Sequence, residues 1–524
     1  MGKYSGGVIA AGHEQTVQAA RTILEDGGNA FDAAVAAHLA ACIAEPVLAS
    51  LAGGGFMLAR TSGGRDVLYD FFVQTPVQKR KGDVEFYPIM GNFGETEQEF
   101  HIGAGSVATP GTVKGLFAIH RDLCTMPMEE LARPAIEMGR NGVMMNHFQA
   151  YILQIIKPIY LATPGAVAIF GSPGGDGLIK EGELFRQPGL ADTIEALTHE
   201  GDDLFYKGGL AKQISHLCAD HGSHLSARDL AGYDVIRRKP LDVTYRGNRL
   251  LTNPAPSSGG TLIAFALKLL DEIPAEVISK KAENGDWLHL LAGIQEMTDR
   301  ARIDDASASD NGHTSAGLLD SRLLDTYREQ IRNNPRFSRG TTQISIIDQN
   351  GNMAALSASN GEGSGLVVPG TGIMLNNMLG EEDLNPGGFG NWACNRRMTS
   401  MMAPSILLMP GNRSVALGSG GSNRLRTAIL QVILNLTDRG MAPAEAVNHP
   451  RIHYENGMLS VEEGFSADEL DELTGEYPDH NIWKGKNLFF GGVHVAGRSG
   501  ESFFGAGDPR RGGVSVTLTG RMAE

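Results

Sequence analysis

The sequence predicts an α+β protein built as a layered sandwich of helices and sheets. Amphipathic helical segments and strand-like segments are mixed along the chain. Several strands are joined by hairpins, whereas a doubly wound parallel sheet would need regular helical crossovers. Glycine accounts for 68 of the 524 residues and stands in short clusters, which indicates many tight turns and close backbone contacts.

The helical segments begin near the N-terminus. The segment 14–26 places its apolar residues on one face, and Gly27-Gly28 is expected to end it. An alanine-rich helix follows over 29–44 and ends before Pro46. Further helices are predicted over 129–139, 186–198, 208–220, 260–272, 285–302 and 423–438.

The strand-like segments include one clear hairpin, over 342–359, whose turn is Asn350-Gly351. The polar segment 303–315 is predicted to be a loop, and the chain shows no internal repeat and no long linker. The predicted strands are 55–61, 66–72, 240–252, 342–348, 352–359, 404–409, 413–418, 489–496 and 514–518.

Composition excludes several classes of partner. With 45 Lys and Arg against 60 Asp and Glu the formal net charge is −15, which argues against nucleic-acid binding. The four cysteines lie far apart, so neither a disulfide framework nor a zinc ribbon is expected. Residues 1–12 lack the apolar core of a secretory signal, and the apolar stretch 30–57 carries charges and a proline. We therefore expect a cytoplasmic protein that does not bind membranes.

The hairpin over 342–359 is preceded by Gly340-Thr341. A peptide bond before a threonine can be cut when the threonine hydroxyl attacks the preceding carbonyl. The freed residue then carries both a nucleophilic hydroxyl and a basic α-amine. A glycine at 340 would tolerate the unusual backbone angles that this cut requires. Because threonine begins many strands, this pattern is weak evidence by itself.

The segment Gly418-Ser419-Gly420-Gly421-Ser422 ends a predicted strand and leads into the helix 423–438. Backbone amides at such a junction, with a helix N-terminus behind them, can stabilise an oxyanion. A plain turn or a phosphate cradle would use similar residues. The segment lacks the GxxxxGK[ST] pattern, so nucleotide binding is not expected.

Several motifs occur together in a fixed order, and with them the chain resembles the γ-glutamyltransferase family of N-terminal-nucleophile hydrolases over nearly its whole length. The motifs are Gly27-Gly28-Asn29-Ala30-Phe31-Asp32-Ala33-Ala34, Gly53-Gly54-Gly55-Phe56-Met57, Pro110-Gly111-Thr112-Val113, Pro256-Ser257-Ser258-Gly259-Gly260, Thr341-Thr342-Gln343, Gly372-Ile373-Met374-Leu375-Asn376-Asn377, Gly420-Gly421 and Asp508-Pro509-Arg510-Arg511-Gly512-Gly513.

The resemblance implies a four-layer αββα sandwich made as a precursor and cut between Gly340 and Thr341. A large subunit, 1–340, and a small subunit, 341–524, would form a heterodimer folded as one compact unit; whether two such pairs associate stays open. Thr341 would be the nucleophile for self-cleavage and for turnover, with neither cofactor nor metal.

The resemblance also assigns supporting residues. Gly420 and Gly421 match the family's oxyanion pair. The hydroxyl that supports the nucleophile's amine falls on Ser359, with Ser357 as an alternative because the spacing is shortened. Asn360 resembles the neighbouring family asparagine.

The chain departs from the family where the γ-glutamyl group is bound. Phe72 stands where the resemblance places the arginine that binds the α-carboxylate. After Asn376-Asn377, Met378 replaces a glutamine, and only Glu381 could replace the acid that holds the α-amino group. Further along, Ser400 is kept but its partner serine is Met401, and Gln343 replaces a histidine.

These departures predict an amide hydrolase or acyltransferase with altered acyl specificity. Losing a carboxylate's arginine is costly, and Phe72, Met378 and Met401 would form an apolar pocket instead. A small-molecule amide with a small or apolar acyl group, of the oxamate type for example, is the expected substrate. If Arg396 or Arg397 supplies the missing cation, the protein is instead a genuine glutathione hydrolase. A second alternative is an uncut, inactive family member that acts as a binding protein.

Two other side-chain groups were weighed as metal sites and set aside. The first has loose spacing at a helix end, and the second lacks the pattern of a calcium loop and is interpreted as a solvated face. They consist of His216, Cys218, His221 and His224, and of Asp299, Asp304, Asp305 and Asp310.

Overall fold

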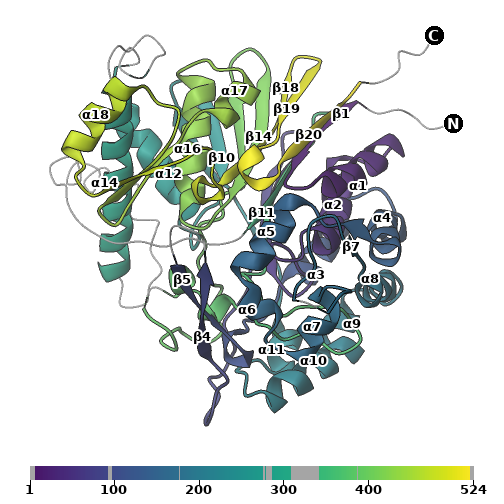
Figure 1. Ribbon diagram of the computed structural model, residues 1–524. Helices are drawn as coiled ribbons and strands as arrows, with labels where there is room; N and C mark the ends of the chain where they lie inside the picture. Colours follow the sequence, from purple (N-terminus) through teal and green to yellow (C-terminus); the bar gives the residue numbers. More distant parts are fainter. Residues whose placement is uncertain are drawn as a thin grey trace, which may run out of the picture.

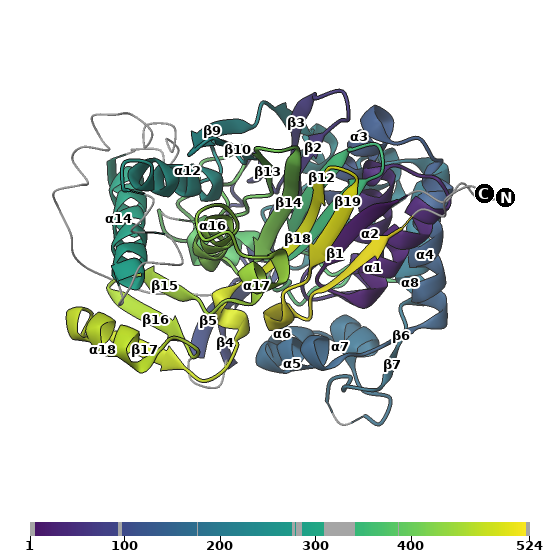
Figure 2. The same cartoon turned by 90° about the horizontal axis from the view of Figure 1, so that it is seen from above.

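The protein was analysed as a computed structural model, which describes residues 6–92, 97–175, 177–274, 278, 286–308, 341–385 and 387–519. Two large antiparallel sheets face each other, and helices cover both outer faces (Figures 1 and 2). The predicted four-layer αββα sandwich is therefore confirmed.

The first sheet has seven strands in the order β20-β1-β11-β12-β2-β3-β8. Residues on both sides of the expected cut contribute to it, because β11 and β12 lie between β1 and β2. Its strands are β1 (Gly7–Ala11), β2 (Gly54–Arg60), β3 (Asp66–Phe71), β8 (Ile236–Arg238), β11 (Thr342–Asp348), β12 (Met353–Ser359) and β20 (Val514–Leu518).

The second sheet has six strands in the order β19-β18-β14-β13-β10-β9. The single strand predicted over 240–252 is in fact the hairpin β9–β10, and the strand predicted over 489–496 begins only at Gly492. Its strands are β9 (Leu241–Tyr245), β10 (Asn248–Thr252), β13 (Ser405–Met409), β14 (Arg413–Gly420), β18 (Gly492–Ser499) and β19 (Ser502–Ala506).

Helices cover each sheet on its outer side (Figure 2). On the first sheet lie α1 (Glu14–Glu25), α2 (Ala30–Ala44) and α3 (Thr112–Leu123), with α4 (Met128–Asn141) and α8 (Pro188–Glu200) behind them. On the second sheet lie α12 (Gly259–Leu270) and α16 (Arg424–Thr437), flanked by α14 (Asp286–Ala308). Residues 303–308, predicted as part of a loop, continue α14; residues 309–315 lie outside the described residues.

Shorter elements surround the sandwich. None of the described helices is long and apolar enough to cross a membrane. These elements are α5 (His147–Ile155), α6 (Lys157–Tyr160), α7 (Pro164–Phe170), α9 (Asp203–Tyr206), α10 (Gly209–Asp220), α11 (Ala227–Gly232), α17 (Pro443–Asn448), α18 (Ala467–Glu476), β4 (Tyr87–Asn92), β5 (Glu97–Ile102), β6 (Val143–Met144), β7 (Leu184–Phe185), β15 (Ile452–Glu455), β16 (Met458–Glu462) and β17 (His480–Trp483).

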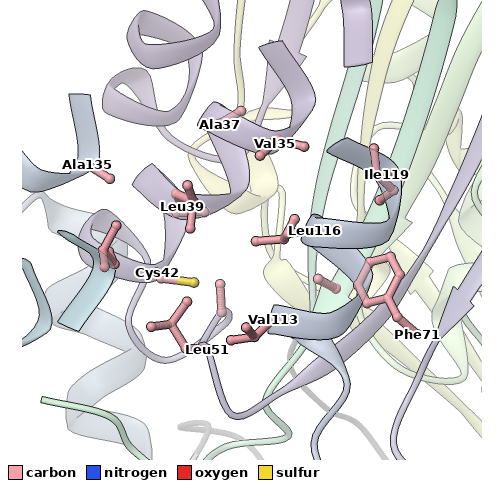
Figure 3. Packing of buried hydrophobic residues seen from close by; sticks show 14 of the residues in the cluster. Val35, Ala37, Leu39, Cys42, Leu51, Phe71, Val113, Leu116, Ile119 and Ala135 are labelled. Carbon is pink, nitrogen blue, oxygen red and sulfur yellow. The ribbon is translucent and has the colours of Figure 1, made fainter. Parts of the chain in front are cut away.

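Three apolar layers separate the four layers of secondary structure. In β11, Ile344 and Ile346 belong to the layer under α1 and α2, whereas Ile347 belongs to the layer between the sheets. A third layer lies between the second sheet and its helices. Figure 3 shows part of the first layer, where Leu39 of α2 and Leu116 of α3 point toward each other. Burial on both faces explains why every residue of β11 is buried.

The motif 27–34 is the start of α2. The Asn29 side chain accepts hydrogen bonds from the backbone of Phe31 and Asp32, and the Asp32 carboxylate accepts one from the Asn29 amide. This is a capping box. Asp32 is fully buried and also accepts three hydrogen bonds from Thr125 and Met126. One carboxylate therefore caps α2 and fixes the loop before α4.

Replacing Asp32 with alanine should lower the free energy of unfolding by about 3 kcal/mol, because several buried donors lose their acceptor. Urea unfolding followed by fluorescence measures this. Asp192→Ala is the control, since its side chain is 68% exposed and pairs only at the surface with Arg140; its effect should stay within about 0.5 kcal/mol. Equal effects of the two substitutions would contradict this role for Asp32.

Candidate active site

Thr341 lies in the wall of a pocket between the two sheets. The pocket is small, with a cavity volume of about 30 Å³. Seven of the residues predicted from the sequence line it: Phe72, Thr341, Ser359, Met378, Glu381, Ser400 and Met401. Five other residues also line it: Asp383, Leu384, Met402, Ser422 and Leu425.

Strand pairing places Thr341 beside Ser359. Thr342 of β11 pairs with Ala358 of β12, so the register carries Thr341 toward Ser359, and both line the pocket. The Ser359 hydroxyl accepts a hydrogen bond from the Gly361 amide at 3.0 Å. Ser357 does not line the pocket, and its hydroxyl donates to the buried Gln343 side chain. Of the two serines weighed from the sequence, Ser359 is the one that shares the pocket with Thr341.

The glycine pair packs directly against Thr341. A Cβ atom on Gly420 would lie 2.1 Å from the Thr341 carbonyl oxygen, so no larger residue fits there. Gly421 has φ +122° and Ser422 has φ +52°, and these left-handed angles turn the chain from β14 into α16. Among the hydrogen bonds of the described residues, none uses the Gly421 amide. The Gly421 amide is therefore a backbone donor near Thr341, just before the N-terminus of α16.

A buried carboxyl group holds the residue after Thr341. The fully buried Glu45 accepts hydrogen bonds from the hydroxyls of Thr342, at 2.7 Å, and Thr16, at 2.6 Å. Burial raises the pKa of Glu45 above its usual range, although both hydroxyls act to lower it. Glu45 follows the last residue of α2, so this contact ties the start of β11 to the first helical layer.

One pocket wall is a loop fixed by two buried asparagines. The Asn376 side chain accepts from Ala108 and Met378 and donates to two carbonyls. The Asn385 side-chain amide donates to the carbonyls of Met378, Leu379 and Glu381. These hydrogen bonds to the backbone position Met378 and Glu381 in the pocket wall.

The opposite wall, residues 400–402, is held by the motif 256–260. The Ser257 hydroxyl donates to the Ser400 carbonyl at 2.6 Å, and the Ser258 amide donates to the same oxygen at 2.9 Å. A Cβ atom on Gly259 would lie 2.0 Å from the Met401 carbonyl oxygen. This close backbone contact gives the glycine-rich motif a structural role, which is to place Ser400 and Met401.

The comparisons with known proteins agree with this geometry. A family model described as gamma-glutamyltranspeptidase matches residues 16–518. The chain belongs to the gamma-glutamyltranspeptidase family. It is therefore an enzyme, in a family of hydrolases and transferases.

Two relatives and one solved structure illustrate the range of this family. The glutathione hydrolase proenzyme of Escherichia coli (strain K12) is 30% identical over 543 residues, which cover 96% of this chain and 90% of that protein. The acylase ACY 1 proenzyme of Pseudomonas sp. (strain SE83) is 30% identical over 538 residues, which cover 99% of this chain and 95% of that protein. The crystal structure of cephalosporin acylase from Bacillus halodurans shares the fold, with a TM-score of 0.83 and 24% identity. The match covers 99% of this chain and 97% of that chain.

Within this gamma-glutamyltranspeptidase fold, the pocket has no cation among its described lining residues. Phe72 is buried and stacks on Phe56, with ring centroids 5.4 Å apart. Arg397 is turned away from the pocket, because its guanidinium donates to the carbonyls of Phe72 and Asp234 and to the Tyr233 hydroxyl. Arg396 does not line the pocket and is exposed. Neither arginine that was weighed as a substitute reaches the site.

Besides the glycine pair, which packs against Thr341 without lining the pocket, three predicted site residues remain to be placed. The Asn377 side chain accepts from the Glu362 amide and donates to the His101 carbonyl. Asn360 is fully buried, and neither its side-chain oxygen nor its nitrogen has a partner within the described part of the chain. Gly340 lies outside the described residues.

The residues set aside as metal ligands do not form a metal-binding cluster within the described part of the chain. Cys218 is fully buried, the His221 side chain contacts Glu85 at 2.9 Å, and His224 accepts from the Arg80 amide. The solvated face predicted for the acidic group is wrong at Asp299, which is 2% exposed and pairs with the buried Arg426. A helix pattern alone did not show that α14 packs against α12 and β15.

Two of the additional pocket residues stand next to motifs that the sequence analysis recognised. Asp383 lies in the acidic run 381–383, two residues after Glu381, and Ser422 directly follows the glycine pair. The Ser422 hydroxyl donates to the Asp383 carboxylate, which links the loop to the N-terminus of α16. Each residue was next to a recognised motif, but only the fold shows that they meet.

Replacing Glu45 with glutamine should raise stability relative to the native protein at high pH. Because its pKa is raised in the folded state, Glu45 favours folding fully below about pH 4.3 and less as the pH rises. The melting temperature of Glu45→Gln minus that of the native protein should therefore increase from pH 5 to pH 8. The exposed Glu14→Gln serves as control and should show a constant difference. A flat difference for Glu45→Gln would contradict the raised pKa.

Proposed function

We propose that this protein is a self-processing amide hydrolase or acyltransferase that uses Thr341 as nucleophile and forms an acyl-enzyme. One observation carries the proposal: Thr341 forms part of the pocket wall while Gly420 packs against its carbonyl oxygen. A hydroxyl nucleophile and amide donors for an oxyanion thus lie together at one site.

In self-cleavage, the Thr341 hydroxyl oxygen attacks the Gly340 carbonyl carbon and the Gly340–Thr341 amide bond breaks. An ester forms, and the nitrogen takes up the proton to become the α-amine of Thr341. Water then hydrolyses the ester, which leaves 1–340 with a carboxylate and 341–524 with the free amine. The two subunits stay together as a heterodimer, because β11 and β12 pair with β1 and β2.

In turnover, the α-amine takes the proton of its own hydroxyl while Oγ attacks the substrate carbonyl. The negative oxygen of the intermediate lies against the amides of Gly420 and Gly421. The leaving amine receives the proton and departs, and an acyl group stays on Thr341. Water releases it as a carboxylic acid, or a second amine accepts it as a new amide. Neither step needs a cofactor or a metal.

We further propose that the acyl group is small or apolar and carries no carboxylate. Phe72, Met378 and Met401 give the pocket apolar walls, and its charged lining residues, Glu381 and Asp383, are acidic. A γ-glutamyl α-carboxylate would meet these acids without a compensating cation, which is unfavourable. Two of the similar proteins are named acylases, which supports acyl groups other than γ-glutamyl.

Intact mass measurement of the purified protein tests the nucleophile. The native chain should give fragments of about 36 and 20 kDa, in the proportion of 340 to 184 residues of the 55.8 kDa chain. Thr341→Ala should stay whole, and Thr341→Ser should be cut because it keeps a hydroxyl. If the native chain stays uncut for days, the protein is an inactive binding member of the family and the catalytic roles are wrong.

A substrate panel tests the acyl specificity. The native enzyme should hydrolyse p-nitroanilides of neutral acyl groups with a kcat/KM at least about tenfold above that of γ-glutamyl-p-nitroanilide. Phe72→Arg should shift this ratio toward the γ-glutamyl substrate, since it restores a cation at the pocket. Phe72→Leu is the matched control and should keep the native preference. A native enzyme that prefers γ-glutamyl-p-nitroanilide and glutathione would be a genuine glutathione hydrolase instead.

A further inference from the structure

Arg511 lies behind the glycine pair, on the C-terminal side of β19. It ends a short 3₁₀ turn, Pro509–Arg511, and is 4% exposed. Its side chain runs across Gly492 of β18, where an added Cβ atom would lie only 2.7–2.8 Å from the Arg511 side-chain carbons. The absence of a side chain at Gly492 therefore creates the channel that Arg511 occupies.

The guanidinium reaches both glycines of the pair. A Cβ atom on Gly420 would lie 3.3 Å from Nη1 of Arg511, and one on Gly421 would lie 3.2 Å from Nη2. The added Cβ atom on Gly420 would also lie 2.1 Å from the Thr341 carbonyl oxygen. The charged end of Arg511 is thus next to the backbone that faces the nucleophile.

The charge of Arg511 is poorly neutralised by its surroundings. Its neighbours Arg451 and Arg510 form ion pairs with Asp508 and Glu462. Within the described residues Arg511 forms no ion pair; its Nη2 donates to the Leu488 carbonyl at 3.2 Å, and its Nε has no partner.

Burial lowers the pKa of Arg511 to about 10, against the opposing effect of the carboxylates of Asp508 and Glu362. The guanidinium therefore stays charged at neutral pH. A second buried cation, Arg424 at the start of α16, is close enough for the charge of Arg511 to lower its pKa.

We propose that Arg511 is a positioning residue that acts through the glycine pair, strengthening the oxyanion site and keeping the α-amine of Thr341 unprotonated at neutral pH. This inference rests on the proposed function, because that amine exists only after cleavage before Thr341. A fixed cation beside the amides stabilises a negative oxygen in a site shielded from water. The same cation repels a proton on the amine, whose ordinary pKa is about 7.7–8.0.

Other charged groups around Thr341 also affect the pKa of its α-amine, some raising it and others lowering it. Glu381 and Asp383 line the pocket, and Glu45 binds the neighbouring Thr342; these carboxyls favour a protonated amine when they are ionised. His494 lies near Glu45, and burial lowers its pKa to about 4, so it is neutral at pH 7. Arg511 and Arg424 are the cations that oppose the acids. The Arg511 guanidinium reaches both glycines of the pair, whereas Arg424 contacts Gly421 through its backbone amide and its guanidinium lies by Phe489 and Glu455.

The pH dependence of kcat/KM tests this inference. Its acidic limb, the rise in kcat/KM with pH, reports the pKa of the catalytic base in the free enzyme. Arg511→Met and Arg511→Gln remove the charge at similar length, and each should move the limb to higher pH by about half a unit or more. Both should also lower kcat by about tenfold or more. Arg511→Lys keeps a charge and should keep the native limb, with a smaller loss of kcat.

Arg439→Met is the matched control. Arg439 is a partly buried arginine just beyond the C-terminal end of α16, over the Trp287 ring, so its loss removes a cation far from the glycine pair. It should leave both the limb and kcat at native values. Melting temperature and intact mass, measured for each variant, show whether it is folded and cut.

Native limbs and kcat values in folded, cleaved Arg511→Met or Arg511→Gln would overturn the inference. If neither neutral variant folds, Arg511→Lys decides, because a limb that moves upward despite the retained charge would also overturn it. A folded neutral variant that stays uncut while Arg511→Lys is cut supports the need for charge at this site. Failure of the proposed function is seen separately, as a native chain that is never cut.

Discussion

The contact between Gly420 and the Thr341 carbonyl is the constraint on which the rest of the site depends. Thr341 precedes β11 of the first sheet, and Gly420 ends β14 of the second. The distance between them is therefore set by how closely the two sheets pack. A side chain at 420 would collide with the Thr341 backbone, so the sheets can approach this closely only because that residue is glycine.

Hydrogen bonds from residues outside the pocket hold large parts of its wall. Asn376 and Asn385 hold the loop that carries Met378 and Glu381, and Ser257 holds the segment that carries Ser400. The side chains of Phe72 and Met378 take no part in these hydrogen bonds, so they can differ from the family's residues while the backbone of the wall is kept.

Charge is distributed unevenly about Thr341. The acids Glu381 and Asp383 line the pocket, whereas the cations Arg511 and Arg424 lie behind the glycine pair. A neutral amide would not be repelled by the acids of the pocket. Negative charge is favoured only beside the glycine pair, where the proposed reaction would place the oxyanion. The same arrangement disfavours an acyl group with its own carboxylate.

The sequence by itself determined the layered α+β class, most helices over the sandwich, the hairpin after Thr341 and seven of the pocket residues. These features are local or are marked by motifs, such as the Asn350-Gly351 turn and the Gly420-Gly421 pair. Short buried segments were missed, since β1 has five residues, all buried, and shows no alternation.

Only the tertiary structure decided which residues meet. It placed Ser359 rather than Ser357 in the pocket, turned Arg397 away from it, and brought Asp383 to Ser422 and Arg511 to the glycine pair. These contacts join residues that are far apart in the chain, or distinguish two serines that lie two positions apart on one strand. They depend on sheet packing and strand register, which no local pattern in the sequence encodes.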